Sequence, residues 1–152
     1  MPDPQSHETA DPPRNPGHSR SPGFSVLDAS ALLTLLFQET GATAVADAIA
    51  DGAAVSTVNL SEVVAVLVRH ERDADRVMHA VIQQVTVEPF TTEDALAAAA
   101  LWAPTRATGL SLGDRACLAL AQRLGVPAVT ADREWANVTV GITIQLLRPA
   151  RS

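Results

Sequence analysis

The sequence predicts an α/β domain in which a central, mainly parallel sheet of about five strands is flanked by helices. Two observations lead to this fold class. Short apolar runs rich in β-branched residues alternate with longer segments that have the apolar spacing of a helix, from about residue 24 to residue 148. Acidic residues follow two of the short runs directly, at Asp28 and Asp132, where a parallel strand delivers a side chain to the ligand-binding edge of its sheet.

The amino-terminal segment, residues 1–23, differs in composition from the rest of the chain. It holds six of the ten prolines and few apolar residues. Such a composition is typical of disorder, so we predict a disordered, proline-rich tail. Residues 24–148 are predicted to form one domain, because a chain of 152 residues is long enough to bury a single core.

The domain is expected to begin with a strand, two helices and a second strand. Residues 24–28 form a short apolar run, and residues 29–37 continue with the spacing of a helix. The alanine-rich residues 41–50 predict a second helix. Residues 53–58 contain several β-branched side chains and predict the second strand.

Helices are expected to dominate the middle of the chain. Asn59 is predicted to cap a third helix that runs to about His70, with Glu62 three residues later, as in a variant capping box. Residues 73–82 predict a fourth helix, and residues 85–87 predict a short third strand.

A fifth helix is predicted over the alanine-rich residues 91–102. Pro104 is expected to stop it, because proline has no backbone N–H to donate within a helix, and residues 105–110 are expected to form a loop. The next helix is predicted over residues 111–124 and ends before Gly125.

The final strands are predicted over residues 126–130 and 142–147. The first of these is a short apolar run with a proline at its edge and an aspartate directly after it, as in a buried parallel strand.

The charge composition excludes several kinds of enzyme. The chain has no lysine, so all eleven basic residues are arginines. A Walker-type phosphate loop, a Schiff-base enzyme and a receiver-type phosphoacceptor site each require a lysine. The net charge of -6 argues against a surface that binds nucleic acid by overall positive charge. Divalent cations at a cluster of carboxylates would offset part of this charge, and arginines could still line a local path.

No membrane or export segment is recognisable in the sequence. No uncharged apolar run reaches the roughly 18 residues of a membrane span. The first two dozen residues lack the apolar middle of a signal peptide. Cys117 is the single cysteine and is expected to be a small buried helix residue, which agrees with a reducing compartment. We therefore expect a cytoplasmic protein.

Four acidic residues stand at junctions between predicted elements: Asp28, Glu62, Asp114 and Asp132. Each also fits an ordinary helix cap, and Thr91 with Asp94 has the same form without any catalytic assignment. An α/β fold would bring the four acids to one edge of the sheet. Carboxylates gathered there repel one another, which favours a hard divalent cation such as Mg2+ or Mn2+.

Polar and basic neighbours of these acids are candidates for supporting roles. Ser30, Asn59 and Thr130 are placed to hydrogen-bond the carboxylates or water, although they also fit ordinary helix-start and strand-end positions. Arg115 and Arg133 each follow a carboxylate directly, and either contact a phosphate or form surface salt bridges.

The ordered set of short segments around these residues resembles the PIN-domain nucleases, and is most similar to VapC-type toxins of bacterial toxin–antitoxin pairs. The segments are residues 27–30, 59–62, 111–115 and 130–133, and the resemblance covers about residues 25–147. It implies a PIN-like three-layer sandwich and a magnesium-dependent endoribonuclease, usually a homodimer. It also implies inhibition by a cognate VapB-like antitoxin that occupies the acidic groove.

By this resemblance the four acids carry over as the metal-binding carboxylates. We assign Asp28 and Asp114 to the main metal site, with Glu62 and Asp132 completing it or orienting water and a second ion. The expected reaction is hydrolysis of an RNA phosphodiester bond.

Two other functions remain open from the sequence. A haloacid-dehalogenase-like phosphatase also places an aspartate after its first strand, but Ser30 stands where its second acid belongs and its lysine is missing. A non-catalytic PIN-like binding module would act only through partners. Apolar residues in the helices at 41–50 and 60–82 are candidates for a groove that takes an amphipathic partner helix.

Overall fold

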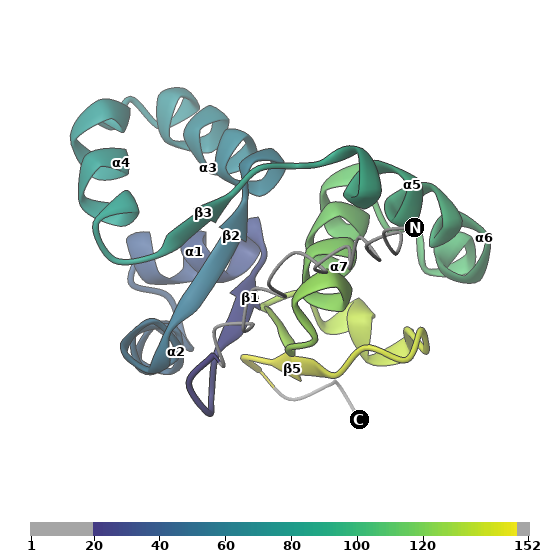
Figure 1. Cartoon of the computed structure of the whole chain (residues 1–152). Helices are drawn as coiled ribbons and strands as arrows, with labels where there is room; N and C mark the ends of the chain where they lie inside the picture. The colour runs from purple at the N-terminus through teal and green to yellow at the C-terminus, as the bar shows by residue number, and fades with distance from the viewer. Residues whose placement is uncertain (1–19, 149–152) are drawn as a thin grey trace, which may run out of the picture.

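A five-stranded parallel sheet forms the centre of the computed structural model, which describes residues 20–148 (Figure 1). Its strands are β1 (Ser25–Leu27), β2 (Ala53–Ser56), β3 (Thr86–Glu88), β4 (Ala128–Thr130) and β5 (Ile144–Leu146). Their order across the sheet is β3-β2-β1-β4-β5, and each neighbouring pair is parallel. The structure thus confirms the predicted fold class, and β1 lies in the middle of the sheet.

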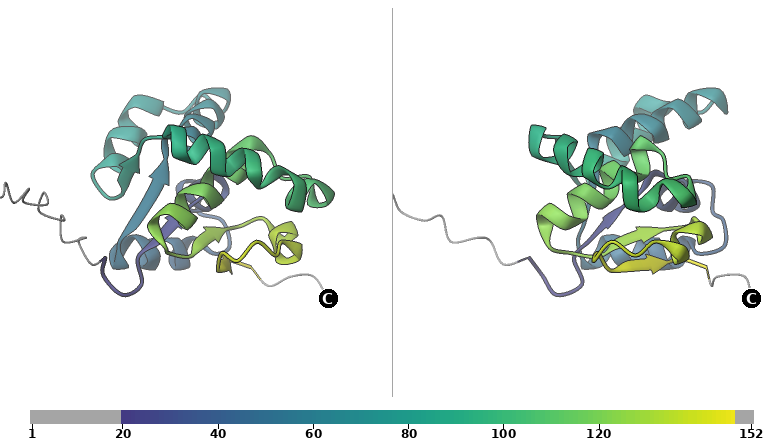
Figure 2. Two further views of the ribbon diagram at one scale, coloured as in Figure 1. Left: turned by 45° about the vertical axis from the view of Figure 1, so that its right-hand side comes forward. Right: turned by 90° about the vertical axis from the view of Figure 1, so that its right-hand side faces the viewer.

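Helices cover both faces of this sheet. They are α1 (Ala29–Leu36), α2 (Ala42–Asp51), α3 (Thr57–Arg69), α4 (Ala74–Ile82), α5 (Thr92–Ala100), α6 (Trp102–Thr105) and α7 (Leu112–Leu124), with two 3-10 helices, η1 (Arg106–Thr108) and η2 (Arg133–Asn137). Helices α1, α2 and α4 lie on one side of the sheet, and α5 and α7 lie against each other on the other side (Figures 1 and 2).

Each face of the sheet has its own apolar core, because successive strand residues point to opposite faces. Leu27 and Val55 pack with α1, α2 and α3 in one core. Val26 and Ala54 pack with α7 and Trp135 in the other. The expected burial of Cys117 is confirmed, because this α7 residue lies in the second core. The result is the three-layer sandwich that the resemblance implied.

The start of α3 differs from the sequence prediction. Ser56, not Asn59, is the capping residue, and its hydroxyl accepts from the Val58 amide at 3.2 Å. The β-branched residues Thr57 and Val58 suggested that the strand continues to residue 58. In the structure β2 ends at Ser56, and these two residues already belong to α3. Asn59 therefore lies buried inside the first turns of α3, where its side chain is free to bond to another helix.

The predicted role of Pro104 as a helix stop is also wrong. Helix α5 already ends at Ala100, and Pro104 lies within the short helix α6. Proline is tolerated there because the N–H groups of a first helical turn have no partner inside the helix. Part of the expected loop over residues 105–110 is the 3-10 helix η1.

The predicted tail, residues 1–23, falls outside the described residues except for its last four. Within that described part, Phe24 N donates to Ser21 O at 3.0 Å and closes a turn. Over residues 20–148, no helix combines the length and apolar character needed to cross a membrane.

Candidate active site

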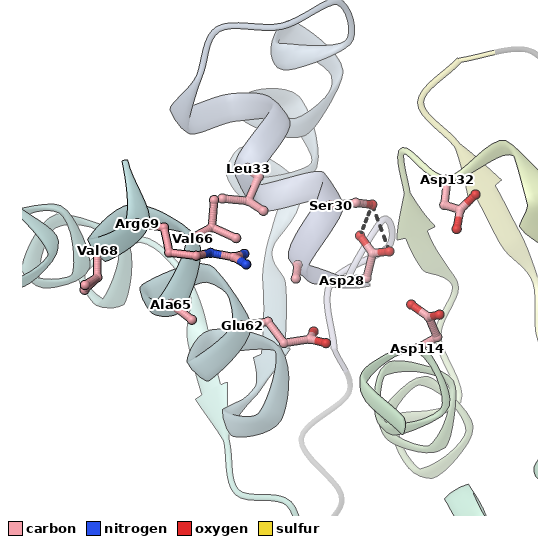
Figure 3. Close-up of a pocket in the computed structure, with 11 residues that line it drawn as sticks. Asp28, Ser30, Leu33, Glu62, Ala65, Val66, Val68, Arg69, Asp114 and Asp132 are labelled. Atoms are coloured by element: carbon pink, nitrogen blue, oxygen red, sulfur yellow. Dashed lines mark hydrogen bonds between the residues drawn. The ribbon is translucent and has the colours of Figure 1, made fainter. Parts of the chain in front are cut away.

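The four predicted acidic residues line one pocket at the carboxyl edge of the sheet. Asp28 follows β1, Glu62 comes from α3, Asp114 from the start of α7, and Asp132 from the turn after β4. Their side chains surround a common space (Figure 3). The pocket has a volume of about 680 Å³. Four segments that are far apart in the sequence are thus brought together, as the parallel sheet predicted.

Asp28 is the buried member of this group, with 3% of its surface exposed. Its Oδ1 caps α1 by accepting from the Ala31 amide at 2.8 Å. Burial raises the pKa of Asp28 to about 6, and the Asp114 carboxylate adds to the rise, while hydrogen bonds from Thr130, Ser30 and Ala31 oppose it. The charged form of Asp28 is therefore costly in this structure, and a cation beside it would relieve that cost.

Ser30 and Thr130 hold the Asp28 carboxylate. Ser30 donates to Asp28 (2.7 Å to Oδ1 and 2.9 Å to Oδ2), and the Thr130 hydroxyl donates to Asp28 Oδ2 at 2.6 Å. The same hydroxyls accept from the next turn of chain, Ser30 from the Ala131 amide and Thr130 from the Asp132 amide. This network joins the ends of β1 and β4 and fixes Asp28 relative to Asp132.

Asn59 holds Glu62 and ties α3 to α7. Its Nδ2 donates to Glu62 Oε2 and to the Gly113 carbonyl, each at 3.0 Å. Gly113 leaves room for Glu62 in this position, because a Cβ there would overlap the Glu62 carboxylate. From the sequence, Asn59 was expected both to cap α3 and to hydrogen-bond a carboxylate; the structure shows the hydrogen bond to Glu62 but not the cap, and the role of Gly113 was missed. A glycine directly before a predicted site aspartate is the signal that could have revealed it.

Asp114 and Asp132 each take part in capping a helix and also line the pocket. Asp114 Oδ2 accepts from the Ser111 amide at 2.8 Å in a complete capping box. Asp132 Oδ1 accepts from the Glu134 amide at 2.9 Å at the start of η2. Among the described residues, the second oxygen of each carboxylate has no hydrogen-bond donor. Capping therefore orients these side chains and leaves an oxygen directed to other partners.

The donor set suits a hard divalent cation. Mg2+ and Mn2+ prefer oxygen ligands, and Mg2+ is commonly held by one or two carboxylates with waters completing its shell. Within residues 20–148, no three acidic, histidine or cysteine side chains are close enough to form a ready-made metal site. The carboxylates fit such an ion as partial ligands, with water supplying the remaining positions.

The two arginines predicted to contact phosphate lie outside this pocket. Arg115 donates to the Ala98 carbonyl of α5 at 2.8 Å. Arg133 lines a neighbouring pocket of about 510 Å³, which shares Asp132 with the first. Arg69, which the sequence analysis missed, lines the carboxylate pocket instead. Its signal was its spacing: it follows Glu62 by seven residues, which puts both on one face of α3.

Solved structures share this fold. A chain of a toxin–antitoxin complex from Klebsiella pneumoniae is 17% identical, with a TM-score of 0.66, over 82% of this chain and 98% of that one. A chain of VapBC2 from Rickettsia felis, bound to a DNA fragment from its promoter, is 10% identical, with a TM-score of 0.66, over 80% and 97%. Mycobacterium tuberculosis VapC20, a Sarcin-Ricin loop cleaving toxin, is 17% identical, with a TM-score of 0.57, over 77% and 90%.

Sequence comparison gives the family. No curated protein matches the chain. The profile of the PIN domain matches residues 25–141, which include all four pocket acids. At their low identities the solved structures establish the fold alone. The profile match spans most of the sequence, and it shows that the chain belongs to the PIN domain family.

Proposed function

We propose that this protein is a VapC-type toxin, an endoribonuclease that hydrolyses RNA phosphodiester bonds with Mg2+ or Mn2+ and is neutralised by a cognate antitoxin. One observation carries the proposal: four carboxylates from four segments line one pocket, and none of them forms an ion pair within residues 20–148. Such a group is costly unless it binds cations.

Asp28 and Asp114 are the proposed main ligands of the ion, and Glu62 and Asp132 complete the site or orient the attacking water. A bound divalent ion lowers the pKa of a water molecule, polarises the phosphoryl oxygen and stabilises the leaving alkoxide. The surrounding residues keep the carboxylates in position: Ser30 and Thr130 hold Asp28, and Asn59 holds Glu62.

Arg133 is the better supported of the two predicted phosphate contacts. It lines the pocket next to Asp132, and among the described residues its side chain donates no hydrogen bond and forms no ion pair. Arg115 would have to leave the Ala98 carbonyl to reach the substrate. We therefore assign Arg133 to a phosphate on the η2 side of the carboxylates, and the role of Arg115 stays a prediction.

Besides the acidic pocket, this protein offers the proposed antitoxin a second binding surface. A groove of about 660 Å³ lies between α1, α2 and α4, with Leu35, Ile49 and Val77 among its apolar lining residues. The helices expected from the sequence to form such a groove contribute to it. An amphipathic antitoxin helix would fill it, as apolar grooves take such helices elsewhere. Solved relatives include VapBC toxin–antitoxin complexes, which supports a partner of this kind. A homodimer and a cytoplasmic site of action complete the proposal.

Cleavage of total cellular RNA by the purified protein tests the function. Wild type and Asp114→Asn are compared in Mg2+, in Mn2+ and in EDTA. We expect discrete fragments from the wild type, lost in EDTA and in the variant. If folded, antitoxin-free wild type leaves all RNA intact with either metal, the protein is a non-catalytic binding module and its carboxylates are helix caps.

A further inference from the structure

The carboxylate pocket extends along α3 beyond the four acids. The side chains that line it there are apolar or basic: Ala65, Val66, Val68 and Arg69 of α3, and Leu33 of α1. Its volume of about 680 Å³ lies within the range of small-molecule sites, whereas a water molecule takes only about 30 Å³ of liquid. The pocket therefore has room for an organic group beside a hydrated ion.

Arg69 is the single basic residue among the described residues that line this pocket. It is exposed at the last residue of α3, and within residues 20–148 its side chain forms no hydrogen bond or ion pair. Its guanidinium extends from α3 toward the side of the pocket that holds Asp28 and Glu62 (Figure 3). By contrast, Arg123 and Arg148 are paired with acids. Arg69 is thus available to bind an anion in the pocket.

We propose that Arg69, Leu33 and Val66 form a nucleotide subsite next to the carboxylates. The Arg69 guanidinium binds a phosphate adjacent to the one that is cleaved, and the apolar side chains contact the base of that nucleotide. This subsite rests on the proposed ribonuclease function and specifies how the RNA strand lies in the site. An arginine fork matches two phosphate oxygens, and apolar side chains pack against the faces of unstacked bases.

The spacing on α3 separates this phosphate from the reacting one. Seven residues of helix advance by about 10 Å, so Arg69 and Glu62 act on different parts of the strand. Apolar Val66 lies between them in sequence, and Leu33 of α1 lines the same part of the pocket. With Arg133 in the neighbouring pocket, a cationic side chain stands on either side of the carboxylates.

Charge explains why such a residue is needed. The chain carries a net charge of -6, and the carboxylates repel the RNA backbone until cations are bound. Because the protein surface as a whole is not positively charged, an arginine next to the reacting phosphate is needed to offset this repulsion locally.

Cleavage of total cellular RNA in Mg2+ tests the subsite with four proteins: wild type, Arg69→Gln, Arg69→Lys and Arg20→Gln. Arg20→Gln is a matched control, because this substitution also removes one arginine charge but far from the pocket. The Arg20 guanidinium donates to the Leu124 carbonyl at 3.2 Å, at the opposite end of α7 from Asp114. We expect Arg69→Gln to lower the initial rate at limiting RNA roughly tenfold, since it removes a charged hydrogen bond. Arg69→Lys should recover part of the rate, and Arg20→Gln should match the wild type.

A binding measurement separates phosphate contact from a purely structural effect. Binding of a labelled single-stranded RNA dodecamer to Asp114→Asn is followed in Mg2+ over a range of salt concentrations. Adding Arg69→Gln should lower the slope of log affinity against log salt by about 0.7, the contribution of one phosphate contact on a single strand. Adding Arg20→Gln should leave the slope unchanged.

Equal cleavage by Arg69→Gln and wild type, or equal losses in Arg69→Gln and Arg20→Gln, would overturn the subsite. So would a loss of antitoxin affinity in Arg69→Gln without any change in cleavage. The wild-type sample distinguishes the two proposals: if it cleaves no RNA, the ribonuclease function fails together with its subsite, whereas normal wild-type cleavage with an active Arg69→Gln removes the subsite alone.

Discussion

Two helices of this protein begin with the same motif and differ in what lies beside it. Helix α5 starts with a capping box formed by Thr91 and Asp94, and α7 starts with one formed by Ser111 and Asp114. In both, the hydroxyl accepts from the aspartate amide at 3.1 Å and the carboxylate accepts from the amide of the capping residue. Local hydrogen bonding therefore gives no reason to assign them different roles.

The neighbouring charges separate the two boxes. Asp94 is buried, with 1% of its surface exposed, and Arg123 donates to both of its oxygens, at 2.7 and 3.0 Å. Burial acts to raise the pKa of Asp94, but the hydrogen bonds from Arg123 and the Thr91 amide outweigh it and hold the pKa below its usual value. Asp114 faces Asp28 and has no cationic partner among the described residues. The Asp114 box is therefore the candidate site, because the negative charge of its aspartate has no protein cation beside it and can be balanced by a bound ligand.

Exchanging each box aspartate for asparagine should separate function from stability. We expect Asp114→Asn to lower RNA cleavage by more than about a hundredfold, because it removes a proposed metal ligand, with little change in stability. Asp94→Asn should retain cleavage but lower the free energy of unfolding by about 3 kcal/mol, since it leaves Arg123 without its charge partner. Cleavage assays and thermal unfolding measure the two effects. Equal losses of stability in the two variants would contradict the comparison.

Asp28 and Asp94 should also differ in the sign of their pH dependence. The folded-state pKa of Asp28, about 6, lies above its ordinary value of 3.8, so its ionisation destabilises the fold as pH rises through this interval. At pH 8 the cost is about 3 kcal/mol, and at pH 5 it is about half of that. Asp28→Asn should therefore raise the melting temperature of the metal-free protein, and more so at pH 8 than at pH 5.

The reverse is expected at the α5 box. The pKa of Asp94 is lowered on folding, so its stabilising effect is present above the unfolded pKa and is lost as pH falls through the folded pKa. Asp94→Asn should cost more stability at pH 7 than at pH 3.5. Thermal unfolding in EDTA between pH 3.5 and pH 8 measures both variants. A loss of stability in Asp28→Asn at pH 8 would show that the ionised Asp28 carboxylate does not destabilise the fold.

The sequence predicted the five strands, the longer helices and the convergence of the four acids, because these depend on local patterns and on the common edge of a parallel sheet. It failed where contacts between distant segments decide. The bond from Asn59 to Glu62 was expected, but its second bond, to the Gly113 carbonyl, joins residues far apart in the sequence and was not. Arg115 follows a site aspartate, yet the helical turn directs it to α5. The difference between Asp94 and Asp114 depends on Arg123, whose partner cannot be known before α5 and α7 are packed together.

The residue before each box aspartate sharpens the comparison further. It is the exposed Glu93 in α5, but the buried Gly113 in α7, where a Cβ would meet the Glu62 carboxylate. Gly113→Ala should displace Glu62 from Asn59 and lower cleavage roughly tenfold, as expected for a change that disorients a metal ligand. Stability should hold, because alanine is the better helix former and the displaced group is the flexible end of a side chain.

Gly125 at the other end of α7 provides the matched control. It has a φ of +65°, and a Cβ added there would meet no neighbouring atom, so alanine would fit sterically but would have to adopt a left-handed backbone. Gly125→Ala should cost about 1 kcal/mol of stability and leave cleavage unchanged. Gly113→Ala should thus lower the cleavage rate and keep the melting temperature, whereas Gly125→Ala should lower the melting temperature and keep the cleavage rate. If Gly113→Ala cleaves RNA as fast as the wild type, the position of the Glu62 carboxylate against α7 is not needed for the reaction, and Glu62 leaves the set of proposed ligands.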